Sequence, residues 1–145
     1  MKEIAAICAL FVVVWNVPVR AATPVSQNIV ASTIFREAGI DGVKGMKAVA
    51  SVIFNRGCGR AANYASVVAK PHQFSCWDTK TLGDGYSHPC TDAAALEITH
   101  ALFDGTFNPG GPWTMFYNPG IVVPVWNKHL RHKVKIGRQV FGVAG

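Results

Sequence analysis

The chain has 145 residues, half of them hydrophobic, and a formal net charge of +6 at pH 7 with histidine counted as neutral. That length suits one domain, and the hydrophobic half supplies enough side chains for a buried core. The sequence contains no low-complexity run, no repeat and no block of like charges, which excludes a disordered chain and a repeat protein.

The first 21 residues have the features of an export signal. Lys2 precedes an unbroken hydrophobic run over residues 4–15, and the sequence Val-Arg-Ala that ends at Ala21 matches a signal-peptidase site. The run is about 12 residues long, whereas a membrane-spanning helix needs roughly 20. We therefore expect residues 1–21 to be a signal peptide and residues 22–145 to be an exported domain. An uncleaved membrane anchor is the alternative.

The domain stays basic after export, because the signal region holds only Lys2, Glu3 and Arg20 as charged residues. An exported basic domain suits an anionic polymer such as a bacterial cell wall, and nucleic acid is the usual alternative. Positive charge is locally rich only over residues 128–138, and charges elsewhere are scattered, which argues against nucleic acid. A basic run of this kind is most often a solvated face.

Hydrophobic periodicity predicts four helices in chain order. They are expected over residues 26–38, 43–56, 63–68 and 91–104. The third is short, because Pro71 prevents its continuation. The capping residues and terminal glycines that support these bounds are Ser26, Gly39, Gly57, Asn63, Thr91 and Gly105.

The remaining segments predict loops and short strands. Residues 72–89 form a long loop rich in glycine, serine and aromatic residues. After a turn at residues 108–112, short strands are expected over residues 114–117 and 134–141, with residues 119–125 as a loop. The predicted fold class is therefore α+β, a mainly helical domain with a small β element and long loops. Long loops in a small domain are usually functional.

Three cysteines remain after export, Cys58, Cys76 and Cys90. An oxidising compartment permits one disulfide with one thiol left over, and the sequence does not select the pair. No C-x-x-C pair or finger-like ligand spacing is present, so neither a metal nor another cofactor is expected.

Glu37 is the candidate catalytic acid. The only other glutamate after residue 21 is Glu97, which lies in an alanine-rich helix and is explained as a solvated residue. Glu37 falls in the last turn of the first predicted helix, where the helix dipole disfavours a carboxylate, and its neighbours Ile34, Phe35 and Ala38 are hydrophobic. A carboxyl placed there can lose hydration, which favours its protonated form and suits a general acid. The alternative is a surface glutamate at a frayed helix end.

Two loop segments combine aromatic rings with amide and hydroxyl groups. They are the Q-F-S-C-W sequence at residues 73–77 and the F-Y-N-P sequence at residues 116–119. Proteins bind sugars by stacking aromatic rings on C–H faces and by hydrogen bonds from such polar groups. The expected lining of the sugar subsites is Gln73, Phe74, Ser75, Tyr117, Asn118 and Trp126. Ordinary core packing is the alternative, most clearly for Phe74 and Phe116.

The same segments resemble, in order, the SleB/CwlJ-like cell wall hydrolase family of the spore-cortex-lytic type. The resemblance covers nearly all of residues 22–145, and four motifs in register are far more specific than one. The residues that carry it are Ile34 to Ala38 with the E-A pair, Gly45, Val49 to Ile53, Asn55-Arg56, Gln73 to Ser75, Phe116 to Pro119, Trp126, Ile136-Gly137 and Phe141.

The resemblance implies a lysozyme-like catalytic domain that cleaves the glycan strands of peptidoglycan. It implies that Glu37, as the glutamate of the E-A motif, is the catalytic acid. Two positions depart from the family pattern. Asp41 stands near the place of a second acidic residue, so it joins the expected substrate-binding residues, and Gln139 replaces a histidine that follows the closing I-G pair.

A reaction with one glutamate is the mechanism expected from these residues. Hydrolysing glycosidases usually need two carboxyls, and only Asp41 is close to Glu37 in sequence. A lytic transglycosylase avoids this need by closing the muramic 6-hydroxyl onto C1, which leaves a 1,6-anhydro end. The alternatives are a muramidase that uses Asp41 or another acid to position water, and a non-catalytic wall-binding module. The expected state is a secreted or periplasmic monomer that binds glycan strands, with no nucleic acid and no membrane insertion after signal cleavage.

Overall fold

The computed structural model describes residues 24–77 and 89–145. The predicted signal peptide and most of the loop predicted over residues 72–89 lie outside the described residues. Within the described part, no helix combines the length and the hydrophobicity that crossing a membrane requires.

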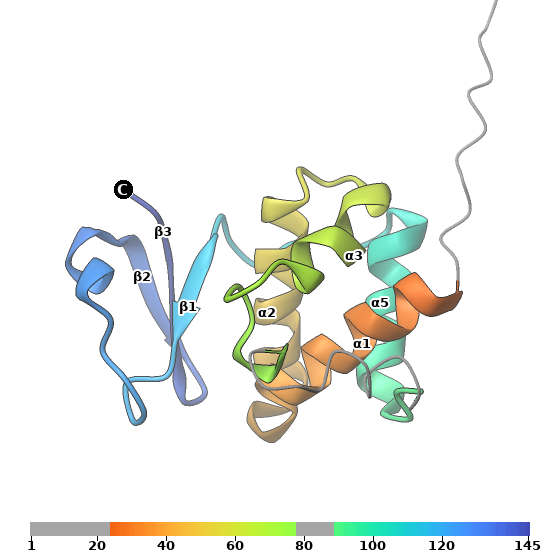
Figure 1. Ribbon diagram of the computed structural model, residues 1–145, viewed down its shortest axis with the longest axis horizontal. Helices are drawn as coiled ribbons and strands as arrows, with labels where there is room; N and C mark the ends of the chain where they lie inside the picture. The colour runs from red at the N-terminus through yellow and green to blue at the C-terminus, as the bar shows by residue number, and fades with distance from the viewer. Residues whose placement is uncertain (1–23, 78–88) are drawn as a thin grey trace, which may run out of the picture.

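Four helices form one side of the molecule and a small sheet forms the other (Figure 1). The helices are α1 (Pro24–Ala38), α2 (Gly42–Arg56), α3 (Ala61–Ala69) and α5 (Ala93–Asp104), with two short 3-10 helices, η1 (Gly39–Asp41) and η2 (Ser75–Trp77). Helix α1 packs against α2, α3 and α5, so it lies at the centre of the helical side. The fully buried hydrophobic residues of these helices include Val30, Ile34, Val49, Val52, Ile53, Tyr64, Val68 and Ala95.

The predicted helices are present, with small differences at their ends. Helix α1 begins at Pro24, in agreement with the preference of proline for the first turn. The N-cap of α5 is Asp92 rather than Thr91, because the Asp92 carboxylate accepts a hydrogen bond from the Ala95 amide at 2.8 Å. Helix α5 ends as predicted at Gly105, which has a left-handed backbone (φ 82°).

The connection between α1 and α2 is tighter than predicted. Gly39 begins η1 instead of ending α1 in a left-handed conformation, and the positive φ of this connection falls at Gly42 (φ 68°). Phe35 lies on the exposed side of α1, where its ring packs over Gly39. Glu37 therefore stands in the last turn of α1, immediately before a compact corner of the chain.

The sheet has three antiparallel strands in the order β1-β3-β2. They are β1 (Met115–Tyr117), β2 (Arg131–Ile136) and β3 (Gln139–Val143), and a 3-10 helix, η3 (Val125–His129), precedes β2. The prediction of a single strand over residues 134–141 is wrong, because this range holds the end of β2, a turn and the start of β3. Ile136 pairs with Gln139 across a tight turn in which Gly137 has a φ of 59°, a conformation that glycine adopts without steric cost.

Aromatic rings join the sheet to the helices. Phe141 on β3 is fully buried, and its ring centroid lies 5.5 Å from that of Phe116 and 5.6 Å from that of Trp113. Phe116 in turn lies 5.9 Å from Phe74, which is 1% exposed. Phe74 is therefore a core residue and not the sugar-binding surface that the loop composition predicted. Its ring is enclosed between Phe116 and the guanidinium of Arg56, which lies 5.4 Å above it.

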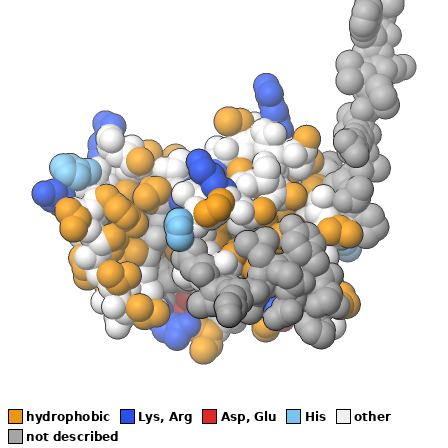
Figure 2. Space-filling model, in the orientation of Figure 1, with side chains coloured by type: hydrophobic (Ala, Val, Ile, Leu, Met, Phe, Trp, Pro, Cys, Tyr) orange, Lys and Arg blue, Asp and Glu red, His pale blue; other side chains and the backbone are white. Residues whose placement is uncertain are grey.

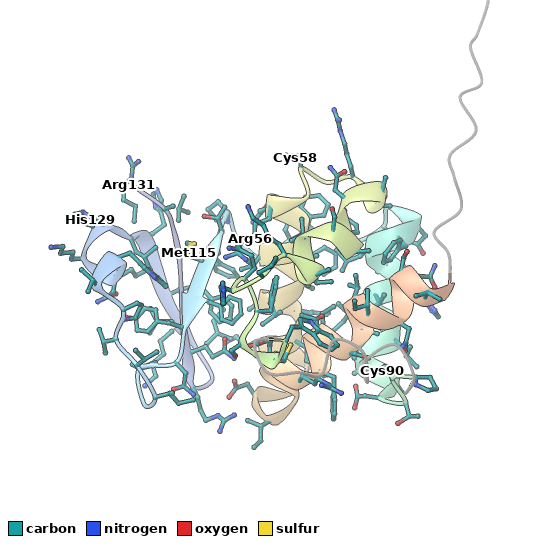
Figure 3. The ribbon with its side chains drawn as sticks, viewed as in Figure 1. Arg56, Cys58, Cys90, Met115, His129 and Arg131 are labelled. Atoms are coloured by element: carbon teal, nitrogen blue, oxygen red, sulfur yellow. The ribbon has the colours of Figure 1, made fainter. Side chains whose placement is uncertain are left out.

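The Asn55-Arg56 pair at the end of α2 positions strand β1. The Asn55 side-chain amide donates hydrogen bonds to the carbonyls of Gly111 and Trp113, at 2.9 and 2.8 Å. The Arg56 Nε donates to the Thr114 carbonyl at 2.6 Å, and Figure 3 shows the Arg56 and Met115 side chains meeting between helix and strand. Burial lowers the pKa of Arg56 from its ordinary value. These partly buried polar contacts fix the sheet against the helical side.

Candidate functional site

A cleft of about 510 Å³ lies between the helical side and the sheet. Its walls come from the end of α1, the end of α2, the loop before η2, strand β1 with the loop that follows it, and the start of β3. Figure 2 shows hydrophobic side chains gathered over the sheet side of the molecule. The residues that line the cleft are Arg36, Glu37, Arg56, His72, Gln73, Ser75, Met115, Phe116, Tyr117, Asn118, Ile121, Val122, Pro124, Trp126, Arg138 and Gln139.

Glu37 is half-buried in the wall of this cleft. The backbone amide of Cys76 donates a hydrogen bond to Glu37 Oε1 at 2.9 Å. The Ser75 hydroxyl lies 3.3 Å from Oε1 and 3.4 Å from Oε2. These donors hold the Glu37 carboxylate in one orientation in the wall of the cleft.

The structure brings most of the predicted site residues together. Gln73, Ser75, Tyr117, Asn118 and Trp126 all line the cleft that contains the candidate acid. The Tyr117 hydroxyl donates to Oδ1 of an asparagine in η3 at 2.7 Å, and the Tyr117 and Trp126 rings meet edge to face at 5.7 Å. The two loop segments identified from their composition are thus neighbours in space. Their half-buried rings and amides line the cleft and can bind both the C–H faces and the hydroxyls of a sugar.

Asp41 does not belong to this group. Its side chain is 3% exposed and does not line the cleft. Asp41 Oδ1 accepts hydrogen bonds from the Arg138 backbone amide at 3.0 Å and from the Arg138 Nε at 3.3 Å. A Cβ at Gly137 would approach the Asp41 carboxyl to 2.6 Å. The predicted substrate contact is therefore a structural tie between η1 and the β2–β3 turn.

Glu37 is the only carboxylate among the described residues that line the cleft. The charged groups around it are the guanidinium groups of Arg36, Arg56 and Arg138. The guanidinium of Arg36 lies 5.1 Å from the ring centroid of Trp77, which keeps it beside the cleft. This surplus of positive charge favours an anionic or electron-rich substrate.

Sequence reasoning missed several cleft residues, of which Gln139 is the clearest. It is 5% exposed, and its side-chain amide donates a hydrogen bond of 2.5 Å to the backbone carbonyl of Glu37. This contact links β3 to the end of α1 and helps to place the candidate acid. The available signal was a polar residue at the start of an otherwise hydrophobic strand segment. Arg56 was also missed as a site residue, although its motif was recognised.

The disulfide expected from export is absent: within the described part of the chain, none joins Cys58, Cys76 and Cys90. The three come from separate places, the loop after α2, η2 and the segment before α5. Figure 3 shows Cys58 and Cys90 at opposite ends of the helical side. Burial raises the pKa of the Cys76 thiol, and the nearby negative charge of Glu37 raises it further.

Thiol alkylation should therefore differ between the cysteines. Iodoacetamide reacts with the thiolate, so exposed Cys58 should be modified well before Cys76 and Cys90, whose pKa values are both raised by burial. Peptide mass spectrometry over a time course measures each rate. The same reaction in urea is the control, because unfolding should remove the differences. Equal rates for Cys58 and Cys76 in the folded protein would contradict this arrangement.

Comparisons with known proteins agree with this architecture. The sequence model described as Cell Wall Hydrolase matches residues 40–142, a range that begins just after Glu37. The catalytic domain of the germination-specific lytic transglycosylase SleB from Bacillus anthracis is 24% identical, with a TM-score of 0.64, covering 87% of this chain and 99% of that one. The catalytic domain of Bacillus cereus SleB is 21% identical, also with a TM-score of 0.64, covering 85% and 93%. No curated protein matches the sequence. The likeness confirms the predicted lysozyme-like α+β fold.

Proposed function

Because the chain belongs to the cell wall hydrolase family, we propose that it cleaves peptidoglycan glycan strands as a lytic transglycosylase with Glu37 as acid and base. The observation that carries this proposal is the presence of one carboxylate among the described residues of the cleft. The Bacillus anthracis domain of similar fold, which is a lytic transglycosylase, supports this reaction type.

The reaction begins with the neutral form of Glu37. Its carboxyl donates a proton to the oxygen that bridges N-acetylmuramic acid and N-acetylglucosamine, and the bond from muramic C1 to that oxygen breaks. The ionised Glu37 then accepts the proton of the muramic 6-hydroxyl, whose oxygen bonds to C1. The products are a free N-acetylglucosamine hydroxyl and a 1,6-anhydro muramic end. No water is consumed, and Glu37 ends the cycle protonated.

The contacts around Glu37 suit this exchange of roles. The Cys76 amide and the Ser75 hydroxyl stabilise the carboxylate after it has given its proton. A carboxylate held in one orientation is ready to accept the proton of the 6-hydroxyl without first reorganising. Gln73, Tyr117 and Asn118 orient the sugars in this proposal. Trp126 provides a face on which a sugar ring stacks.

A hydrolytic muramidase is less well supported. Retaining hydrolysis usually places two carboxyls roughly 5–5.5 Å apart, and inverting hydrolysis places them roughly 6.5–9.5 Å apart. Asp41, the candidate for the second carboxyl, does not line the cleft, and its Oδ1 accepts a hydrogen bond from the Arg138 backbone amide. A wall-binding module without activity would not need a carboxylate held by two donors inside a cleft.

The setting of the reaction is part of the same proposal. Residues 1–21 act as a signal peptide, and residues 22–145 work as a monomeric domain outside the cytoplasm, where peptidoglycan is found. The positive charge of the cleft suits a polymer whose peptide stems carry carboxylates.

Mass spectrometry of the products released from purified sacculi tests the proposed reaction. We expect muropeptides that are lighter by one water than the products of a muramidase, because their muramic ends are 1,6-anhydro rings. Digestion of the same sacculi with a known muramidase provides the hydrated reference. Reducing muramic ends in place of anhydro ends would show that the chain is a hydrolase, and an absence of released muropeptides would refute the enzymatic proposal.

A further inference from the structure

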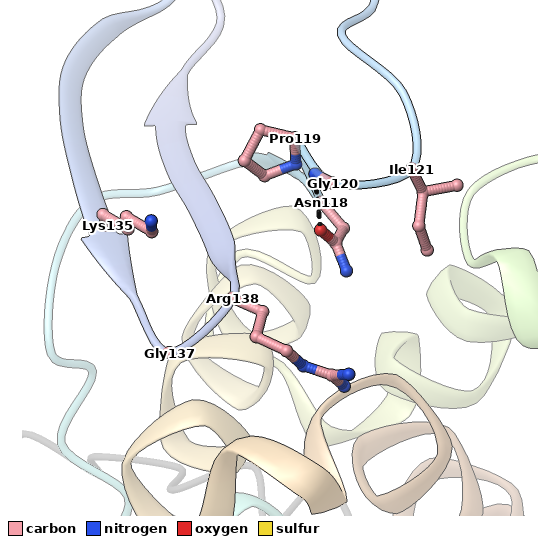
Figure 4. A pocket seen from close by; sticks show the side chains of 7 residues that line it. All are labelled: Asn118, Pro119, Gly120, Ile121, Lys135, Gly137 and Arg138. Carbon is pink, nitrogen blue, oxygen red and sulfur yellow. Dashed lines mark hydrogen bonds between the residues drawn. The ribbon is translucent and has the colours of Figure 1, made fainter.

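A second, shallow recess of about 460 Å³ adjoins the cleft on the sheet side. It shares Asn118, Ile121 and Arg138 with the cleft, so the two spaces are continuous along these side chains. Figure 4 shows the recess between the loop after β1 and the turn that joins β2 to β3. The remaining residues that line it are Pro119, Gly120, Lys135 and Gly137. A substrate bound at Glu37 can therefore extend a group into the recess.

The polar side chains of this recess are hydrogen-bond donors. Asn118 Oδ1 accepts a hydrogen bond from the Gly120 amide at 2.9 Å, which turns the Asn118 NH₂ group toward the open space (Figure 4). Lys135 reaches in from β2, and Arg138 extends below Asn118 from the hairpin turn. An ammonium and a guanidinium carry donors and no acceptor. No residue lining the recess has a carboxylate.

Part of the Arg138 charge is offset, because its Nε lies 3.3 Å from Asp41 Oδ1. The Arg138 side chain is 57% exposed, so the outer nitrogens of its guanidinium remain open to a ligand. Lys135 is also exposed. Together with the Asn118 amide, these groups complement a ligand that offers acceptors and negative charge, such as a carboxylate.

We propose that this recess binds a carboxylate of the peptide stem that a muramic acid residue carries, an inference that rests on the proposed function. The sugar rings of an intact strand are uncharged, because the muramic lactyl group is joined to its stem by an amide. The stems supply the carboxylates of the polymer. A recess that continues the cleft and presents two cations and an amide donor therefore selects strands whose stems keep their charge.

A comparison of two substrates and three proteins tests this inference. The substrates are native peptidoglycan and the same material after carbodiimide-mediated conversion of its carboxylates to amides. The proteins are the full chain, Lys135→Gln and the control Lys133→Gln, which removes an equal charge from an exposed position on β2 outside the recess. The measured quantity is kcat/KM for the release of muropeptides.

On native peptidoglycan, Lys135→Gln should lower kcat/KM by roughly 3- to 5-fold, mainly through KM, as expected for one partly exposed charge pair. On the amidated substrate, Lys135→Gln and the unmodified chain should have the same kcat/KM, because the substrate no longer carries the partner charge. Lys133→Gln should behave as the unmodified chain on both substrates. A fourth protein, Lys135→Arg, keeps the positive charge and should therefore retain most of the kcat/KM of the unmodified chain. An equal loss for Lys135→Gln on both substrates, or no loss on either, would overturn the stem-binding role. If the unmodified chain releases nothing from either substrate, the proposed function fails instead.

Discussion

Glu37→Gln should abolish release of muropeptides from peptidoglycan while the fold and glycan binding persist. Glutamine has nearly the same shape, and its side-chain oxygen can still accept the hydrogen bond that the Cys76 amide donates. An amide cannot give a proton to a glycosidic oxygen or take one from a hydroxyl. General acid–base catalysis contributes typically about 10²–10⁴ in rate, and here one group performs both steps. We therefore expect a loss of at least 10²-fold in kcat.

The chain provides a matched control for this substitution. Glu97 lies exposed on α5, away from the cleft, and Glu97→Gln makes the same chemical change. It should leave the rate unaltered. Sedimentation of each protein with insoluble peptidoglycan measures binding, and circular dichroism checks the fold. Retained cleavage by Glu37→Gln would show that another group is the acid. Loss of binding along with cleavage would instead indicate that Glu37 serves mainly to hold the substrate.

Phe141→Ala should lower the free energy of unfolding by about 3–5 kcal/mol. The Phe141 side chain is fully buried on the central strand of the sheet, and its ring contacts those of Trp113 and Phe116. Removing it leaves a cavity where the sheet meets the helical side. Such a cavity costs both the lost burial of the ring and the lost contacts around it.

Urea denaturation followed by tryptophan fluorescence measures this change, with Ile121→Ala as the control. Ile121 is 82% exposed, so its truncation should alter the free energy of unfolding by no more than about 0.5 kcal/mol. A loss below about 1 kcal/mol for Phe141→Ala would mean that the sheet packs on the helices without this ring. Phe141→Ala should also reduce activity. Gln139, on the same strand as Phe141, donates a hydrogen bond to the Glu37 carbonyl, so a disturbed strand would displace the candidate acid.

The cleft depends on contacts that hold its two walls together. Asn55 and Arg56 join the end of α2 to the segment that leads into β1. At the other end, Asp41 joins η1 to Arg138 in the β2–β3 turn. Both ties are made by polar side chains that reach backbone groups across the interface. The spacing between Glu37 and the sugar-binding loops follows from these ties and from the aromatic packing between them.

Sequence alone determined the helices, the fold class and the identity of the candidate acid. Hydrophobic periodicity and glycine positions are local signals, since the residues that make a helix are also close in the chain. Glu37 could be selected because glutamates are few after residue 21 and because its position near a helix end is unfavourable for a charge. The grouping of amides and aromatic rings in two loops was also visible.

Tertiary structure alone decided which side chains meet. Ser75 and Glu37 are 38 residues apart in the chain, and Asp41 and Arg138 are 97 apart, so no local pattern links either pair. Composition could not distinguish Phe74, which is buried, from Trp126, which lines the cleft. Local periodicity decides which segments form helices. The hydrogen-bond partners of a polar group depend instead on how whole elements pack, because burial and hydrogen bonding are satisfied across the assembled core.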